Sequence, residues 1–84
     1  QLFDRIDLAE GSTVLDVGCG LGVHTEAIRQ LGYKPIGVDI SEVAIEEAKR
    51  RYTHVDFIRC DVEYLAYPDN QFDMVFMRGI SWCH

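Results

Sequence analysis

Three glycines, at positions 18, 20 and 22, directly follow the short apolar segment Thr13–Val17. A turn of this composition lets a ligand approach the backbone, because glycine has no side chain to hold it away. Acidic residues stand at the ends of three apolar segments: Asp16, Asp39 and Asp61. A carboxylate accepts hydrogen bonds from hydroxyl and amino groups and attracts a cation. This combination predicts a site for a small ligand that carries hydroxyl groups and a positive charge.

The spacing of the glycines narrows the ligand class. A dinucleotide-binding turn has the pattern G-x-G-x-x-G/A, whereas the sixth position of this turn is Val23. The Lys-Ser/Thr pair of a nucleoside triphosphate-binding loop is absent. Asp16 would repel a pyrophosphate but attract an ammonium or sulfonium group. The alternative is that the glycines serve only a tight turn between a strand and a helix.

The elements that must position these residues alternate along the chain. We expect strands at 13–17, 35–39, 55–59 and 72–77, helices at 23–31 and 41–52, and a loop at 63–71. Leu2, Phe3 and Ile6 suggest the end of an earlier helix. Strands that alternate with helices of this length favour a parallel sheet with right-handed crossovers, and the apolar strands predict that both faces are covered. In such a sheet, ligands bind at the carboxyl ends of the strands.

Composition excludes several classes of partner. The net charge is −6, with 14 acidic and 8 basic residues, which argues against nucleic acid. No apolar run has the ~18 residues of a membrane span. The three cysteines have neither metal-ligand nor redox spacing, so we expect no metal site and reduced thiols in the cytoplasm. Because the chain begins at Gln1, we expect a fragment.

Three segments, VLDVGCGLG, GVDIS and CDVEYLAYPDNQFDMVF, resemble in order and spacing the successive motifs of class I S-adenosylmethionine-dependent methyltransferases. The resemblance covers essentially the whole chain, and the PDNQFD segment looks most like the group that modifies small molecules. It implies an α/β, Rossmann-like, doubly wound parallel sheet truncated to about four strands in the order 3-2-1-4. Residues 1–84 would form the cofactor-binding half of a methyltransferase domain, inactive alone. The fourth strand would then be an open apolar edge.

The resemblance implies S-adenosylmethionine as cofactor and a role for each motif residue. The glycine turn would hold the methionine end, with Cys19 as a small filler, and Asp16 would bind the amino group. Asp39 would accept from the ribose hydroxyls, and Asp61 from the adenine amino group. The remaining implied contacts are Ile40 on the adenine ring, the Val62 backbone amide, and Met77 beside the sulfonium. Asp16 and Asp61 could instead be turn-forming aspartates.

The methyl acceptor is expected to be a small molecule, and the residue that activates it is not evident. His84 follows the fourth strand and is a candidate general base. Two other functions remain open. One is a nicotinamide or flavin oxidoreductase, which the glycine spacing and Asp16 argue against. The other is a methyltransferase-like domain that serves as a non-catalytic scaffold.

Overall fold

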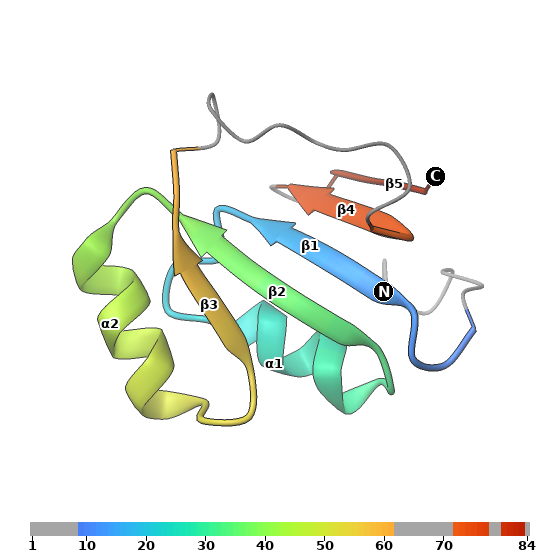
Figure 1. Ribbon diagram of the computed structural model, residues 1–84, viewed down its shortest axis with the longest axis horizontal. Helices are drawn as coiled ribbons and strands as arrows, with labels where there is room; N and C mark the ends of the chain where they lie inside the picture. The colour runs from blue at the N-terminus through green and yellow to red at the C-terminus, as the bar shows by residue number, and fades with distance from the viewer. Residues whose placement is uncertain (1–8, 62–71, 78–79, 84) are drawn as a thin grey trace.

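A computed structural model of the chain describes residues 9–61 and 72–77 in full, together with the backbone of residues 80–83. Figure 1 shows the described elements in the order β1 (Thr13–Val17), α1 (Val23–Gln30), β2 (Lys34–Asp39), α2 (Glu42–Arg51), β3 (Asp56–Arg59), β4 (Met74–Met77) and β5 (Ile80–Cys83). The predicted helices and strands therefore all exist, with boundaries that differ by one or two residues. The segments suggested at residues 2–6 and 63–71 lie outside the described residues. The first two residues of the strand predicted at 72–77 precede β4.

The described strands form one sheet in the order β3-β2-β1-β4-β5. β1 pairs in parallel with both β2 and β4, and β2 pairs in parallel with β3. The predicted strand order 3-2-1-4 and fold class are confirmed. β5 was not predicted, and it lies antiparallel along β4. The expectation that β4 is an open edge is therefore wrong, because residues 80–83 supply its outer neighbour.

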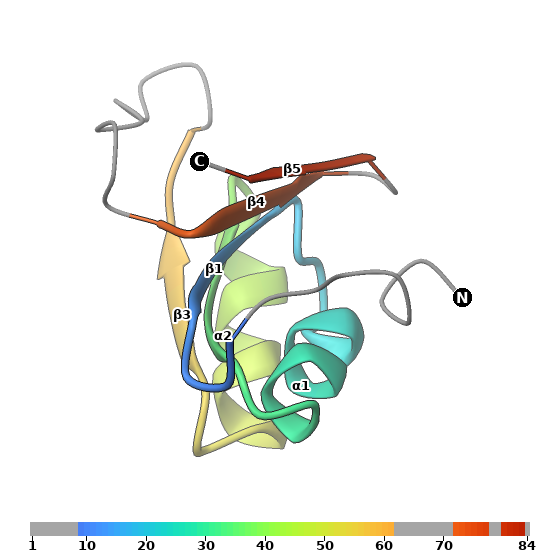
Figure 2. The ribbon, with the colours of Figure 1, turned by 90° about the vertical axis from the view of Figure 1, so that its right-hand side faces the viewer.

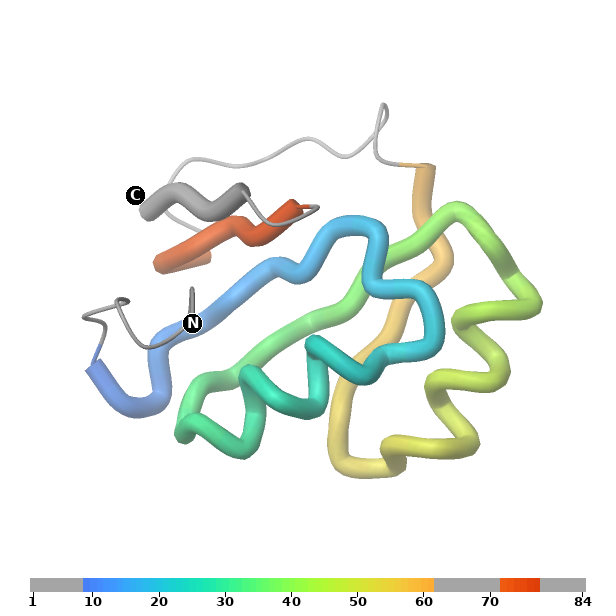
Figure 3. Tube along the Cα trace, turned by 180° about the vertical axis from the view of Figure 1, so that it is seen from behind, coloured from blue at the N-terminus to red at the C-terminus, as the bar shows by residue number. Residues whose placement is uncertain are grey.

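Both described helices lie on one face of the sheet, as the side view in Figure 2 and the view from behind in Figure 3 show. Gly22 is the N-cap of α1, and its φ of 88° lies in the left-handed region that glycine favours. Ser41 is the N-cap of α2, and its side chain accepts a hydrogen bond from the Ala44 amide at 3.2 Å. This hydrogen bond caps the helix, and it satisfies one amide that has no partner inside the helix.

Alternation along the strands divides their side chains between two faces. On the helix side, one row runs across four strands through Phe57, Gly37, Asp16 and Phe76, which the sheet register places side by side. The opposite face carries a separate buried cluster formed by Leu15, Val17, Val38 and Val75. The side chain of Asp16 therefore projects toward α1, while that of Val17 projects to the other face.

Among the described residues, no helix is long and apolar enough to span a membrane.

Candidate cofactor site

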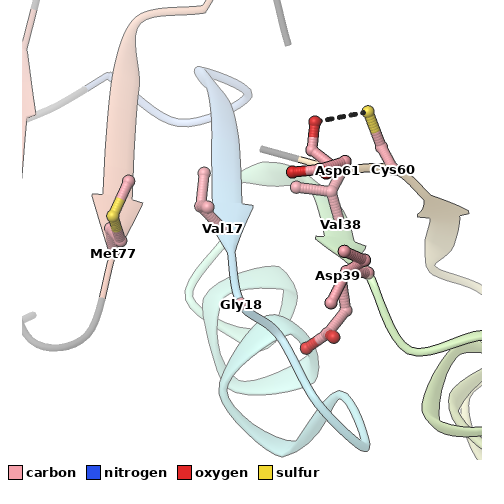
Figure 4. A pocket seen from close by; sticks show the side chains of 8 residues that line it. Val17, Gly18, Val38, Asp39, Cys60, Asp61 and Met77 are labelled. Atoms are coloured by element: carbon pink, nitrogen blue, oxygen red, sulfur yellow. Dashed lines mark hydrogen bonds between the residues drawn. The ribbon is translucent and has the colours of Figure 1, made fainter. Parts of the chain in front are cut away.

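A cavity of about 290 Å³ lies at the carboxyl ends of the parallel strands. Figure 4 shows side chains from β1, β2 and β4 and from the residues after β3 around it. This volume is at the lower end of the ~300–1,000 Å³ typical of small-ligand pockets. The lining residues are Val17, Gly18, Val38, Asp39, Ile40, Cys60, Asp61 and Met77. The cavity thus combines an apolar wall with two carboxylates at the sheet edge where α/β proteins bind ligands.

The glycine turn over residues 18–22 is held by hydrogen bonds to the tip of β2. The amides of Gly18 and Cys19 both donate to the Val38 carbonyl, at 2.8 and 3.0 Å. The amide of Gly20 donates to Oδ2 of Asp39 at 2.8 Å, and that of Gly22 to the Cys19 carbonyl at 3.0 Å. These four amides are therefore already bonded within the protein. The first amides of α1 lack partners inside the helix, so they are donors available to a ligand carboxylate.

Asp39 uses both of its carboxylate oxygens within the protein. Oδ2 accepts from the Gly20 amide, and Oδ1 accepts from the Ser41 amide at 2.9 Å. Each oxygen of an ionised carboxylate has about two acceptor positions, so one remains on each for a pair of hydroxyl groups. Arg59 supports the same segment from β3, because its Nε donates to the Ile40 carbonyl at 3.1 Å. The end of β2 and the residues after it are therefore held by hydrogen bonds from the glycine turn, from the Ser41 amide and from Arg59.

Asp16 is buried, with only 2 % of its surface exposed, and it is not among the residues that line the cavity. Its Oδ2 accepts a hydrogen bond at 2.7 Å from the hydroxyl of Thr25, which is itself fully buried on α1. Burial raises the pKa of Asp16, while the Thr25 hydrogen bond and the charge of nearby His24 act in the opposite direction. In this structure, Asp16 ties β1 to the first turn of α1.

Cys19 is a half-buried thiol inside the turn. Burial, with the negative charges of Asp16 and Asp39, raises its pKa to about 12. Only a thiolate is strongly nucleophilic, so this residue is inert at neutral pH. The environment of Cys19 is consistent with the predicted role of a small filler.

The three glycines of the turn differ in what surrounds them. A Cβ added at Gly18 or Gly20 would meet nothing within 4 Å, whereas a Cβ at Gly22 would lie 2.6 Å from the Phe57 ring. Two of the glycines therefore leave open space beside the backbone, as the sequence predicts for ligand approach. The third faces protein.

The structure brings together five of the predicted cofactor-binding residues, which line the cavity: Gly18, Asp39, Ile40, Asp61 and Met77. It places four others outside the lining, namely Asp16, Cys19, Gly20 and Gly22, although the last three belong to the adjoining turn. Val62 and the candidate base His84 lie outside the described residues. A contact between any of these residues and a cofactor stays a prediction.

Three lining residues were missed from the sequence: Val17, Val38 and Cys60. Each stands directly before a predicted site residue, and a signal for them existed, because a cavity at strand ends must include the last side chains of those strands. Within the described part of the chain, no group of three or more His, Cys, Asp and Glu side chains is arranged to hold a metal ion.

Residues 14–84 match a family model described as a methyltransferase domain. Two curated relatives illustrate the range of the matches. The chain is 31 % identical over 74 residues to a malonyl-[acyl-carrier protein] O-methyltransferase of Yersinia pestis, which covers 87 % of this chain and 28 % of that protein. It is 37 % identical over 71 residues to an eEF1A lysine and N-terminal methyltransferase of Mus musculus, covering 79 % and 10 %. The chain thus spans less than a third of either relative.

Solved structures share the fold of the chain. The PH0226 protein of Pyrococcus horikoshii superimposes with a TM-score of 0.78 at 32 % identity, over 88 % of this chain and 36 % of that one. The similarity of both sequence and fold therefore extends over nearly all of the present chain.

Proposed function

Because the chain belongs to the methyltransferase domain family, we propose that the protein containing it transfers the methyl group of S-adenosylmethionine to an acceptor. The observation that supports this proposal best is the cavity at the carboxyl ends of β1, β2, β3 and β4, with Asp39 and Asp61 in its wall. Two carboxylates favour a ligand that is cationic and rich in hydroxyl groups over a dinucleotide diphosphate. The oxidoreductase alternative has no comparable support.

When bound, the cofactor supplies an electrophilic methyl group on a positively charged sulfur. The residues of this chain would bind and orient it. Asp39 would accept from a ribose diol and Asp61 from the adenine amino group, and Ile40 would cover the base. The chemistry is a direct displacement, so the contribution of these residues is alignment and exclusion of water.

We propose a small-molecule acceptor, as suggested by the resemblance of the PDNQFD segment and by the malonyl group in the name of the Yersinia pestis relative. The mouse relative is named for protein acceptors, which makes a protein the second candidate. We also propose a cytoplasmic location, because Cys19 and Cys60 are free thiols.

Calorimetric titration of the complete protein with S-adenosylmethionine, S-adenosylhomocysteine and NADH tests the cofactor. We expect binding of the first two and none of the third. Asp61→Asn should weaken binding by about 1 kcal/mol, because a hydrogen bond to a charged acceptor is about twice as strong as one to a neutral acceptor. The matched control is Asp56→Asn, an exposed carboxylate on β3 outside the cavity lining, which should leave binding unchanged. Binding of NADH alone would refute the proposal.

Transfer of radiolabelled methyl from the cofactor to a small-molecule or a protein fraction distinguishes the two acceptor classes. Tight cofactor binding without transfer to either fraction would favour the non-catalytic scaffold.

A further inference from the structure

An aromatic ring fills the space between β2 and the end of the glycine turn. Phe57 on β3 is 5 % exposed and lies opposite Gly37 of β2 in the sheet register. A Cβ added at Gly37 would lie 2.7 Å from Cδ1 of the ring, and a Cβ added at Gly22 would lie 2.6 Å from Cζ. Separations this short are not tolerated between carbon atoms. The ring therefore lies directly against two glycine backbones that are 15 residues apart in the sequence.

The side chain of Phe57 is enclosed in a buried apolar cluster, which restricts its movement. Phe57 belongs to a buried cluster with Ile45 and Ala48 of α2 and with Val55. Cys19 and Tyr52 pack against the same cluster. The Sγ of Cys19 would also lie 3.0 Å from a Cβ at Gly37, so the turn and the ring meet over this one residue of β2.

Gly22 is the residue at which the turn ends and α1 begins. Its amide closes the turn on the Cys19 carbonyl, and its carbonyl accepts the Glu26 amide of the first helical bond at 2.9 Å. A ring that limits how closely Gly22 approaches the sheet therefore limits both the turn and the start of the helix. The other two glycines of the turn have no such neighbour.

We propose that Phe57 is a positioning residue of the cofactor site, which sets the distance of the glycine turn from β2 and thereby the affinity for the cofactor. Gly22 and Gly37 are then glycines because the ring occupies the space of their side chains, while Gly18 and Gly20 are glycines on the side open to a ligand. The expected effect of Phe57 on cofactor affinity rests on the proposed function, whereas its expected effect on the position of the turn does not.

A size exchange between Gly37 and Phe57 tests the contact. Gly37 has no positive φ, so an alanine there is restricted only by its neighbours. In the complete protein, Gly37→Ala should weaken binding of S-adenosylhomocysteine about tenfold or more, because the ring or the turn must move. The double variant Gly37→Ala/Phe57→Leu should bind more tightly than the Gly37→Ala variant, because the smaller side chain leaves room for the methyl group. Independent effects that simply add, as they do at distant sites, would overturn the proposal.

A stability control separates positioning from general loosening of the core. Val55 belongs to the same cluster and is 8 % exposed, but it supplies none of the three atoms nearest to a Cβ at Gly22 or Gly37. Val55→Ala and Phe57→Leu should both lower the melting temperature, and only Phe57→Leu should raise the Kd for S-adenosylhomocysteine. If the Kd rises in proportion to the loss of melting temperature in both variants, Phe57 acts only as a core residue and the proposal is overturned.

Hydrogen exchange without any ligand keeps the test independent of the proposed function. The amides of Gly18, Cys19 and Gly20 are bonded to β2, so their exchange reports whether the turn keeps its place. Phe57→Leu should accelerate their exchange more than Val55→Ala does, and equal rates in the two variants would overturn the proposal. If the unmodified complete protein binds neither S-adenosylmethionine nor S-adenosylhomocysteine, the proposed function fails, while the exchange rates still decide the role of Phe57.

Discussion

The carboxylate of Asp39 accepts a hydrogen bond from the amide of Gly20, 2.8 Å away, across 19 residues of sequence. The acid at the end of β2 and the middle of the glycine turn are therefore one structural unit. A residue expected to bind the ribose also holds the segment expected to bind the methionine end. Its replacement has two consequences, which must be measured separately.

We predict that Asp39→Ala in the complete protein lowers the affinity for S-adenosylmethionine by about 1–3 kcal/mol or more, because an acceptor for the ligand and the anchor of Gly20 are lost together. Asp39→Asn should also lose affinity, since an amide nitrogen cannot accept from a backbone N–H. Calorimetry measures the affinity, and hydrogen exchange at Gly20 measures the release of the turn. An unchanged affinity in both variants would remove Asp39 from the site.

The buried pair of Thr25 and Asp16 makes a prediction about stability. Thr25→Val keeps the shape of the side chain but removes the hydroxyl that donates to Asp16 at 2.7 Å. A buried acceptor left without its partner costs about 1–3 kcal/mol. We expect that loss in the free energy of unfolding by urea, while Thr25→Ser, which retains the hydroxyl, should lose much less. A loss in Thr25→Ser that is absent from Thr25→Val would show that the methyl group matters rather than the hydrogen bond.

The raised pKa of Asp16 predicts how stability changes with pH. As pH rises above ~4, the carboxyl of Asp16 ionises in the unfolded chain. In the folded protein the same carboxyl still holds its proton, because its pKa is higher there. Stability should therefore fall, relative to the Asp16→Asn variant, until pH passes the pKa of the folded state. Urea unfolding of both proteins across this range gives the difference directly. Asp56→Asn, which replaces an exposed carboxylate on β3, is the control. A stability difference between the unmodified protein and Asp16→Asn that does not vary with pH would contradict the burial effect.

The glycines at 20 and 22 should respond differently to the same substitution. Both have a positive φ, of 56° and 88°, so alanine at either position should cost about 1–2 kcal/mol in backbone strain. Gly22→Ala must in addition displace the Phe57 ring, whereas Gly20→Ala meets open space. We therefore expect the larger loss of unfolding free energy in Gly22→Ala. Equal losses would mean that the ring moves at no cost.

Cys19 should be protected from alkylation in the folded protein. With a pKa of about 12, its thiolate fraction at pH 8 is lower than that of an ordinary thiol by a factor on the order of 10³. Mass spectrometry after iodoacetamide treatment of native and urea-unfolded protein measures the ratio of rates at this residue. Comparable rates in the two states would show that the thiol is neither buried nor suppressed by the nearby carboxylates.

Much of the fold was predictable because its signals are local. The alternation of strands with helices predicted a parallel sheet, and the resemblance implied its strand order. The helix predicted at 41–52 has Ser41 as its N-cap in the structure. The strand β5 was missed, although only two residues, ending in a glycine, separate it from β4. Two residues are the commonest length of connection between the strands of a hairpin. The strand was missed because the resemblance implied that the fourth strand is the open edge of the sheet.

The site was less predictable where it depends on which face of a strand a residue occupies. Asp39 and Asp61 lie at strand ends, so their place in the cavity follows from topology. Asp16 lies within β1, and the register places its side chain on the helix face with Thr25. The role of Gly22 depends on Phe57, 35 residues later. No pattern local to the glycine turn contains that information.

The four internal bonds of the glycine turn have a thermodynamic consequence for recognition. A loop that is disordered before binding must lose backbone entropy of about 1–2 kcal/mol per residue when a ligand arrives. Here the amides of Gly18, Cys19, Gly20 and Gly22 are already fixed by contacts within the protein. The turn is preorganised, so it already has its ordered conformation before a ligand binds. Little of the binding free energy is then consumed in ordering the chain.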